Sequence, residues 1–396
     1  MSLNETVSAD RVHIAFFGKR NAGKSSLVNA VTGQSLAVVS DVKGTTTDPV
    51  KKAMELLPIG PVMIIDTPGF DDGGDLGALR VKKTREVLAK CDIAVLVVDA
   101  TVGYGKEDEE FLTLVKEKGI PCITVYNKSD LASARTADAI YVSAKNGDGV
   151  TELKEKLGSL AKTKENTKRI VADLLYEGDV VVLVTPIDAS APKGRLILPQ
   201  QQTIRDILDA NCISIVTQVE QLAATLAALK EPPKMVITDS QAFGKVSKIV
   251  PENIPLTSFS ILFARYKGDL ITQVQGAAAL SKLCDGDKVL ISEGCTHHRQ
   301  CGDIGTVKMP AWIGNFSGAK VEYTFTSGGE FPADLAEYKL IVHCGGCMLN
   351  EAEMKSRVAA ATAAGVPVVN YGVAIAHMHG ILHRSLELFP DVYKLI

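Results

Sequence analysis

Hydrophobic residues in the first part of the chain form short continuous runs, and each run ends in a polar or glycine-rich turn. These runs cover 12–17, 62–65, 93–98, 122–126 and 140–142. Helical periodicity follows the first run over 26–31 and returns over 149–160. Short apolar runs that are bounded by turns are typical of buried parallel strands. Their alternation with helices predicts an α/β domain over residues 1–162.

The same alternation continues over the rest of the chain. Helical patterns at 201–208 and 219–229 lie among apolar runs at 180–184, 212–216, 235–238 and 256–264. A third group combines helical patterns at 270–283 and 351–364 with strand patterns at 289–292, 320–325, 338–342 and 368–371. We therefore expect two smaller α/β domains with mostly parallel sheets, over 171–267 and 268–396. The segment 163–170, which is rich in lysine and threonine, is the expected linker.

Composition narrows the range of partners. The chain has 396 residues, of which 46% are hydrophobic and 22% charged, and its formal net charge is −3. This balance gives no electrostatic reason to expect a nucleic acid or a membrane surface as a partner. The first residues lack the regions of a signal peptide, and the apolar runs are well short of the ~18 residues of a membrane span. We expect a soluble, cytoplasmic protein.

A phosphate-binding pattern follows the first predicted strand. Residues 18–25 read GKRNAGKS, which is G-x-x-x-x-G-K-[ST] in the strand–loop–helix context that this pattern requires. Its glycines let backbone N–H groups approach phosphate oxygens, Lys24 would reach the β- and γ-phosphates, and Ser25 would ligate Mg²⁺. The predicted nucleotide contacts here are Gly18, Asn21, Ala22, Gly23, Lys24, Ser25 and Ser26.

Two further sequences have the order and chemistry of γ-phosphate and Mg²⁺ sites. Asp66 ends a predicted strand and begins the sequence DTPG, so it would lie near the Mg²⁺ ion. Gly69 in that sequence would present its N–H to the γ-phosphate. The sequence GTTTD supplies Thr45 as a nucleotide contact and Thr46 as a Mg²⁺ ligand. We expect Lys24, Thr46 and Gly69 to take part in catalysis.

Base-contacting residues are predicted at the ends of the last two strands of this domain. Asp130 belongs to the sequence NKSD, and its carboxylate suits two N–H donors of guanine that adenine does not match. The sequence SAK after the last strand resembles the final base-contacting loop of GTPases. The predicted base contacts are Asn127, Lys128, Asp130, Ser143, Ala144 and Lys145. Five elements in the correct order indicate that the nucleotide is GTP.

The sequences NAGKSS, GTTTD and DTPGF resemble those of translation-factor-related GTPases close to the tRNA-modifying and ribosome-assembly members. In the potassium-activated members, an asparagine at the position of Asn21 coordinates K⁺ beside the phosphates. The resemblance therefore implies a K⁺ site at Asn21 and potassium-stimulated hydrolysis. Phe70 stands where Ras-like enzymes have the glutamine that orients the attacking water. Another residue, a cation or a rearranged switch must therefore orient the water.

Metal-binding residue types form two clusters nearer the C-terminus, one with Cys295 and His297 and one with His343, Cys344 and Cys347. Both follow predicted strands, at the sheet edge where α/β proteins place ligands. A helix after the second cluster would stabilise its thiolates through the helix N-terminus. Four interpretations remain open: a [4Fe–4S] cluster on three cysteines with one iron position open, a zinc site that includes a histidine, a catalytic thiol at Cys295, and chance crowding.

The GTPase sequences, the α/β middle segment and the pattern C-x-H…H-C-x-x-C together resemble the [FeFe]-hydrogenase maturation GTPase family, HydF. The resemblance covers essentially the whole chain. It implies that Cys295, Cys344 and Cys347 hold a [4Fe–4S] cluster, with His297 and His343 as ligands or as supporting groups. It also implies a homodimer formed through 171–267.

The same resemblance implies a scaffold and carrier. Such a protein receives a diiron precursor made with two radical maturation enzymes and delivers it to apo-[FeFe]-hydrogenase. The alternative is a tRNA-modification or ribosome-assembly GTPase with a structural zinc site. The mildly acidic composition counts against this alternative, because RNA-binding proteins usually carry a basic surface.

Overall fold

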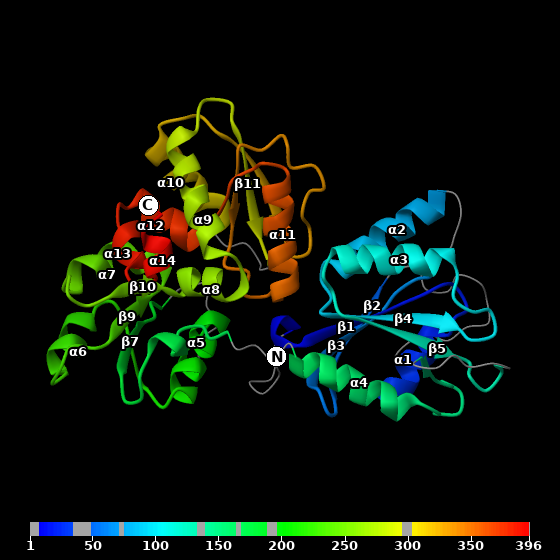
Figure 1. Ribbon diagram of the computed structural model, residues 1–396. Coiled ribbons are helices and arrows are strands. Elements are labelled where there is room, and N and C mark those ends of the chain that lie inside the picture. Colours follow the sequence, from blue (N-terminus) through cyan, green and yellow to red (C-terminus); the bar gives the residue numbers. More distant parts are fainter. Residues whose placement is uncertain are drawn as a thin grey trace. The chain divides into compact units, whose positions relative to one another are not determined.

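The computed structural model describes residues 8–34, 49–70, 75–132, 139–163, 168–187, 196–294 and 303–395. Contacts divide the chain into two compact units, Met1–Glu165 and Asn166–Ile396. Each unit has its own sheets and helices (Figure 1). Within the described ranges, no helix combines the length and the apolar character that crossing a bilayer requires.

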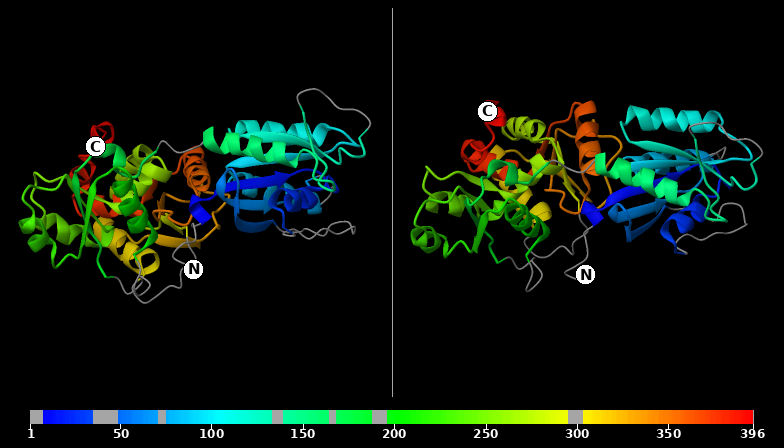
Figure 2. Two further views of the ribbon diagram at one scale, coloured as in Figure 1. Left: turned by 90° about the horizontal axis from the view of Figure 1, so that it is seen from below. Right: turned by 60° about the horizontal axis from the view of Figure 1, so that its bottom comes forward.

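The first unit is built on a six-stranded sheet with the order β2-β3-β1-β4-β5-β6. Strand β2 runs antiparallel to β3, and the other pairs are parallel. Helices α1 and α4 cover one face and α2 and α3 the other (Figure 1, Figure 2). The bounds are β1 Val12–Phe17, α1 Lys24–Thr32, β2 Val50–Leu56, β3 Gly60–Asp66, α2 Asp75–Leu88, β4 Ile93–Asp99, α3 Lys106–Glu117, β5 Cys122–Asn127, β6 Ile140–Tyr141 and α4 Val150–Thr163.

Continuous apolar runs are what this sheet requires, because its central strands are buried on both faces. In β1, Ile14 and Phe16 join the core beneath α1 and α4, whereas Ala15 and Phe17 join the core beneath α2 and α3. Consecutive side chains of a strand point to opposite faces, so no polar position remains between them. The predicted α/β GTPase fold is confirmed, and its predicted strands agree with the observed ones within two residues.

The second unit contains two four-stranded sheets, with the orders β10-β9-β7-β8 and β12-β11-β13-β14. All their pairs are parallel, which confirms the predicted sheet type. The strands are β7 Val180–Val184, β8 Ile213–Thr217, β9 Met235–Thr238, β10 Leu256–Ser258, β11 Lys288–Glu293, β12 Glu322–Ser327, β13 Leu340–His343 and β14 Val368–Asn370.

Helices pack around both sheets of this unit (Figure 1, Figure 2). The helices are α5 Leu198–Asp209, α6 Leu222–Ala228, α7 Phe243–Ile249, α8 Phe259–Lys267, α9 Leu270–Ala277, α10 Met309–Ser317, α11 Glu351–Ala363, α12 Tyr371–Met378, α13 Leu382–Leu386 and α14 Pro390–Tyr393. A single π-type turn, Ile304–Lys308, leads directly into α10. Because β11 and β13 are paired in parallel, their carboxyl ends lie side by side at one edge of their sheet. The loops with the predicted metal ligands begin at this edge.

One apolar core connects the two sheets of the second unit. It includes Val182 and Ile237 from the first sheet and Ile291 and Val342 from the second. Helix α9 approaches β14 so closely that a Cβ atom at Gly276 would overlap the Val368 carbonyl oxygen. The division of this unit into separate domains at 267/268 remains a prediction.

The hydrophobicity of the run 256–264 favours a single strand, but the run does not form one. It divides into the short strand β10 and the beginning of α8. Ser258 ends the strand and accepts a hydrogen bond at 3.3 Å from the Ile261 N–H, which caps the helix. Helix α8 is buried on most of its surface, so it lacks the polar face that would have revealed its periodicity.

Candidate nucleotide and metal sites

The phosphate-binding loop between β1 and α1 depends on its two glycines. Gly18 has a φ of 151° and Gly23 a φ of 82°, which are conformations that other residues rarely adopt. A Cβ atom at Gly18 would overlap the Val97 carbonyl oxygen, and one at Gly23 would overlap the amide of Asn127. The predicted loop is therefore present, and its backbone packs tightly against two neighbouring strand ends.

Lys24 lies inside this loop. Its residue is only 7% exposed, and its Nζ donates hydrogen bonds to the carbonyl oxygens of Gly18 at 3.0 Å and Lys19 at 2.7 Å. Phosphate oxygens carry more negative charge than carbonyl oxygens and are stronger acceptors for an ammonium group. In a complex with a nucleotide, phosphate oxygens would therefore replace these two carbonyl oxygens as the acceptors of Lys24.

Ser25 and Asp66 form a set of oxygen atoms that fits Mg²⁺. The Ser25 hydroxyl donates to Asp66 Oδ2 at 2.6 Å, and Asp66 Oδ1 is buried without a hydrogen-bond partner among the described residues. Burial raises the pKa of Asp66, although the Ser25 hydrogen bond and the Lys24 charge oppose this shift. A buried carboxylate oxygen without a partner is costly, and a hydrated Mg²⁺ ion would satisfy it.

Asn127 joins the phosphate loop to the base loop. Its Nδ2 donates to the carbonyl oxygens of Ala22 at 3.0 Å and Gly23 at 3.3 Å, and its Oδ1 accepts from the Ala144 N–H at 3.1 Å. All polar atoms of this buried amide are therefore used inside the protein. We infer that Asn127 positions the loops that contact the nucleotide.

The predicted base contacts converge at the ends of β5 and β6. Ser143 Oγ donates to Asp130 Oδ1 at 2.8 Å, while Lys145 is exposed beside them. Lys128 forms an ion pair with Asp99 at 2.6 Å. Burial raises the pKa of Asp99, but hydrogen bonds from Lys128 and Thr101 outweigh this and lower it. Asp99 was not predicted from the sequence, because it belongs to no nucleotide motif.

The remaining predicted catalytic positions are only partly described. Gly69 is buried at the end of the segment after β3, but Thr45 and Thr46 lie outside the described residues. Phe70 stacks on Phe111 of α3, with ring centroids 5.3 Å apart and planes 8° apart. Its ring therefore belongs to the core beneath α2 and α3. This placement agrees with the inference that Phe70 does not orient water.

Phe111 provides a test of this packing. It is 5% exposed and also contacts Phe17 of β1 at 4.9 Å between ring centroids. We expect Phe111→Ala to destabilise the first unit by about 3–5 kcal/mol, because it removes a ring from both contacts. Scanning calorimetry, which can resolve the two units, measures the change. Phe111→Leu should cost clearly less, and equal losses for both variants would contradict this packing.

The second predicted site begins at the carboxyl ends of β11 and β13. Cys344 Sγ accepts hydrogen bonds from the backbone N–H groups of Gly294 at 3.0 Å and Gly346 at 3.4 Å. Gly294 immediately precedes Cys295 in the sequence. Backbone N–H groups that surround a cysteine sulfur suit a thiolate ligand, so this set fits an iron–sulfur cluster. Cys295 and His297 lie outside the described residues, as do His298 and Cys301.

Two glycines at this edge, Gly294 and Gly346, leave no space for larger residues. A Cβ atom at Gly294 would come within 2.7 Å of Leu349 and 3.4 Å of Gly346. Gly346 has a φ of 61°, and a Cβ atom there would overlap Met354 of α11. Backbone conformation and packing therefore both require glycine at 346, whereas a Cβ atom at Gly345 would meet nothing within 4 Å.

The Cys344 thiol is not activated by its surroundings. Burial raises its pKa to about 11, and the nearby Cys347 adds to the shift, while the N–H groups of Gly294 and Gly346 oppose it. The expected stabilisation of thiolates by the following helix does not outweigh burial, because α11 begins only at Glu351. A metal ion would have to displace the proton, as thiolate sites generally require.

His343 is held by two partners and is 3% exposed. Its Nδ1 is 2.7 Å from the Cys344 carbonyl oxygen, and its Nε2 is 3.1 Å from Nη1 of Arg357. Arginine is a donor only, so Nε2 accepts and Nδ1 carries the proton. Burial lowers the pKa of His343 to about 4. Both ring nitrogens are engaged, which favours a supporting role over iron ligation.

Among the described residues, no group of three or more His, Cys, Asp or Glu side chains is arranged to hold a metal ion. Two of the three predicted cysteine ligands, Cys344 and Cys347, are described and lie on one turn. The third, Cys295, lies outside these residues. The complete ligand set therefore remains a prediction.

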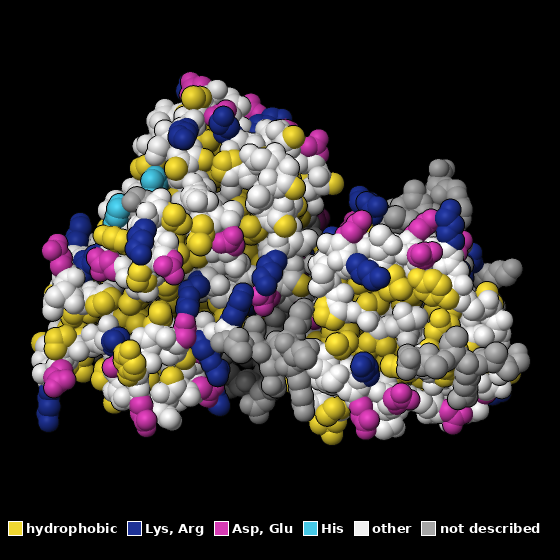
Figure 3. All heavy atoms as spheres, viewed as in Figure 1, with side chains coloured by type: hydrophobic (Ala, Val, Ile, Leu, Met, Phe, Trp, Pro, Cys, Tyr) yellow, Lys and Arg dark blue, Asp and Glu magenta, His cyan; other side chains and the backbone are white. Residues whose placement is uncertain are grey.

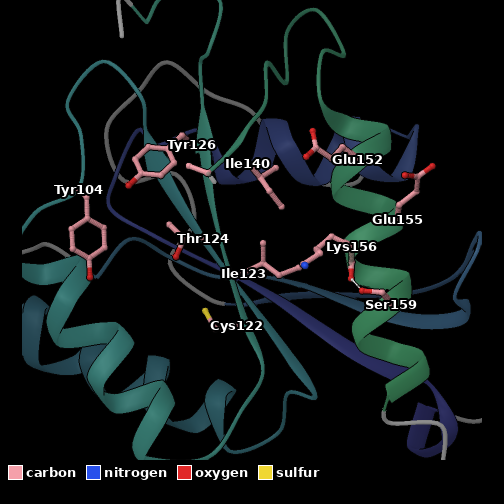
Figure 4. A pocket seen from close by; sticks show the side chains of 11 residues that line it. Tyr104, Cys122, Ile123, Thr124, Tyr126, Ile140, Glu152, Glu155, Lys156 and Ser159 are labelled. Carbon is pink, nitrogen blue, oxygen red and sulfur yellow. Dashed lines mark hydrogen bonds between the residues drawn. The ribbon is translucent and has the colours of Figure 1, made fainter. Parts of the chain in front are cut away.

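A cavity of about 950 Å³ lies along β5 and beside α4 in the first unit (Figure 4). Figure 4 shows Tyr126, Thr124 and Lys156 around it. None of its lining residues belongs to the predicted nucleotide site. It is separate from the chemistry described above.

Comparisons with protein families give three matches. Residues 13–128 match the 50S ribosome-binding GTPase model, 170–268 the Hydrogen maturase F dimerization domain, and 271–388 the Hydrogen maturase F tetramerization domain. The GTPase match supports GTP and Mg²⁺ binding and GTP hydrolysis. The matches to the dimerization and tetramerization domains support oligomer formation. The tetramerization match, 271–388, overlaps the segment predicted to bind the cluster.

Curated relatives match part of the chain. GTPase Der from Kosmotoga olearia is 33% identical over 175 residues, which are 39% of each chain. The tRNA modification GTPase MnmE from Thiobacillus denitrificans is 36% identical over 148 residues, 36% of this chain and 32% of that protein. The chain thus spans two fifths or less of the length of these relatives.

A crystal structure of Era from Aquifex aeolicus bound to GDP·AlF₄⁻ has 19% identity and a TM-score of 0.35, and covers 52% of this chain and 93% of that one. The match to the GTPase model, 13–128, lies within the first unit, whereas two matches to Hydrogen maturase F domains account for most of the second. The chain therefore belongs to the HydF family of hydrogenase maturase GTPases.

Proposed function

We propose that this chain is a cytoplasmic GTP-hydrolysing scaffold that holds a [4Fe–4S] cluster and carries a diiron precursor to apo-[FeFe]-hydrogenase. The observation that carries the proposal is the surroundings of Cys344, whose sulfur accepts two backbone N–H groups where β11 and β13 end. Cys295, Cys344 and Cys347 would hold the cluster. Three cysteine ligands leave one iron position for a further ligand, and that position would supply the attachment point for the cargo.

In the nucleotide site, Lys24 would neutralise the β- and γ-phosphates, and Ser25, Thr46 and Asp66 would hold Mg²⁺ directly or through water. The Gly69 N–H would contact the γ-phosphate. Asn21 would hold K⁺, and its side chain is exposed in the phosphate-binding loop and therefore accessible to an ion. We expect potassium to stimulate hydrolysis for this reason.

The two radical maturation enzymes would supply the precursor, and GTP binding would change how strongly the scaffold contacts its partners. Coupling of this kind requires that partner affinity differs between nucleotide states. Equal affinity of apo-hydrogenase for the GTP-bound, GDP-bound and nucleotide-free protein would contradict it.

Transfer of cargo is the direct test of function. The reconstituted protein is incubated anaerobically with the two radical maturation enzymes and precursor substrates, separated from them, and mixed with apo-hydrogenase. Hydrogen evolution should appear with the wild-type protein and be absent without the preincubation. Hydrogen evolution that does not depend on this protein would overturn the proposed function.

The alternative function, a tRNA-modification or ribosome-assembly GTPase with a structural zinc site, is not favoured. Two Hydrogen maturase F domains cover residues 170–268 and 271–388. Basic and acidic side chains are interspersed on the face drawn in Figure 3. Such a face lacks the continuous basic surface that binds an RNA backbone.

The homodimer has a structural candidate in β8, an edge strand of its sheet. Ile213 and Val216 of this strand are 51% and 44% exposed, and Leu208 of the neighbouring α5 is 54% exposed. Edge strands with exposed apolar residues readily pair with another chain. We propose that β8 pairs with β8 of a second copy.

We expect Ile213→Glu to weaken this dimer about tenfold or more, because each copy would bury an unpaired charge at the interface. Analytical ultracentrifugation over a concentration series measures the dissociation constant. Leu57→Glu is the matched control, since Leu57 is 78% exposed in the first unit. A dissociation constant equal to that of Leu57→Glu would place the interface elsewhere.

A further inference from the structure

A buried guanidinium lies directly behind the predicted cluster site. Arg357 on α11 is 5% exposed, and its two terminal nitrogens make four hydrogen bonds. Nη1 donates to Ser292 Oγ at 3.2 Å and to His343 Nε2 at 3.1 Å. Nη2 donates to the Gly328 carbonyl oxygen at 2.6 Å and to Glu353 Oε1 at 2.8 Å. Every N–H of the two terminal nitrogens therefore has a partner.

Three of the four acceptors of Arg357 lie at the carboxyl ends of three adjacent strands. Ser292 belongs to β11, His343 ends β13, and Gly328 directly follows β12. Two of these strands lead into the segments with the predicted cysteine ligands. The Cys344 N–H also donates to the Ser292 carbonyl oxygen at 2.9 Å, which fixes the two strand ends to each other. One side chain thus sets the relative positions of both ligand segments.

Arg357 also determines how the His343 ring is used. Since it can only donate, it fixes the histidine as the tautomer with a proton on Nδ1. That proton is donated to the Cys344 carbonyl oxygen at 2.7 Å. The Cys344 peptide is thereby oriented at the start of the turn whose Gly346 N–H faces the Cys344 sulfur.

We propose that Arg357 is a positioning residue for the iron–sulfur site, which acts through His343 and Ser292 to present backbone N–H groups to Cys344 Sγ. This inference rests on the proposed cluster and adds a residue outside the C-x-H…H-C-x-x-C pattern. Glu353 balances the charge of Arg357, and the guanidinium lies over the Phe331 ring, 5.2 Å from its centroid. The position suits arginine and not lysine, because an ammonium group cannot reach four acceptors in one plane.

Loss of this arrangement has a defined effect on a bound cluster. Backbone N–H groups stabilise negative charge on sulfur, and hydrogen bonds to sulfur help to set the reduction potential. If the Cys344 turn is no longer fixed, these donors are lost or weakened. The cluster should then be harder to reduce, so its potential becomes more negative. Its release to a chelator should be about 10–100-fold faster, as found for groups that orient metal ligands.

The test compares Arg357→Lys and Arg357→Gln with two changes at His343. His343→Asn keeps a donor near the position of Nδ1 and so keeps the bond to the Cys344 carbonyl oxygen. His343→Gln keeps an acceptor near the position of Nε2 and so keeps the bond from Arg357. Arg384→Lys is the matched control, because Arg384 donates to three backbone carbonyl oxygens of the same unit, at Ser247, Val250 and Pro251.

Each variant of the full chain is reconstituted anaerobically, and its potential is measured by redox titration followed by electron paramagnetic resonance. We expect a more negative potential and faster chelator release for both Arg357 variants, with His343→Asn closer to wild type than His343→Gln. Arg384→Lys should keep the wild-type potential even if it unfolds at a lower temperature.

Wild-type potential and release rate in Arg357→Lys would overturn the inference. Shifts of equal size in Arg384→Lys would also overturn it, because they would reflect general loss of stability. If the Arg357 variants do not fold, the potentials and release rates of the two His343 variants decide the question. Values for His343→Gln that are closer to wild type than those for His343→Asn would overturn the inference. A wild-type chain that takes up no cluster would instead refute the proposed function, which separates the two failures.

Discussion

Lys24→Ala is expected to reduce GTP hydrolysis by about 10²–10³-fold, the loss typical of removing one donor that stabilises transition-state charge. Lys24 is 7% exposed, and its ammonium group is held between two carbonyl oxygens of the phosphate loop. Phosphate release is measured with saturating GTP, Mg²⁺ and K⁺. The variant should also bind GTP more weakly, because the β- and γ-phosphates lose a cationic partner.

Lys106→Ala is the control for this prediction. Lys106 lies at the start of α3 in the same unit, and its side chain is 85% exposed in an ion pair with Glu110. Such exposed pairs contribute little, so hydrolysis should remain near the wild-type rate. A Lys24→Ala variant that keeps more than about half of the wild-type rate would contradict the assignment of this loop to the phosphates.

Cys344→Ser should remove nearly all bound cluster and leave GTP hydrolysis unchanged. Serine at this position loses the thiolate, and a hydroxyl is a poor ligand for iron in such clusters. Hydrolysis should be retained because the nucleotide residues lie in Met1–Glu165 and Cys344 in Asn166–Ile396. Iron and sulfide content after anaerobic reconstitution measures the first effect, and phosphate release measures the second.

Cys212→Ser distinguishes loss of a ligand from loss of any buried cysteine. Cys212 is 5% exposed in the same unit, and its Sγ donates to the Tyr176 carbonyl oxygen at 3.0 Å. A serine hydroxyl can make the same bond, so the cluster content should stay at the wild-type level. Equal iron loss in both variants would mean that Cys344 acts through stability and not as a ligand.

Most of the first unit could be predicted from its sequence, because its signals are local. The run 12–17 is a buried strand, and the glycines that follow it have the backbone angles that the phosphate pattern requires. The strand patterns of the second unit were also found, since parallel strands that are buried on both faces read as apolar runs. These elements are therefore predictable from local hydrophobicity and local turn chemistry.

The errors and omissions come from interactions between distant segments. Helix α12 is apolar on nearly all sides, so the apolar pattern 368–371 includes its first residue, Tyr371, in the predicted strand. The Lys128–Asp99 ion pair joins residues 29 positions apart, and Arg357 reaches Ser292 across 65 positions. No spacing rule reveals such pairs, because they depend on which strands become neighbours in the sheet. Thr46, Cys295 and His297 remain predictions, since they lie outside the described residues.

We propose that Cys295, Cys344 and Cys347 hold a [4Fe–4S] cluster in this GTPase. Anaerobic reconstitution with iron and sulfide, followed by reduction and electron paramagnetic resonance, tests this proposal. We expect about four iron atoms per chain and a reduced-cluster signal, both lost when any of the three cysteines is replaced by serine. A chain that retains tightly bound zinc and shows no cluster signal would mean that these cysteines form a zinc site instead.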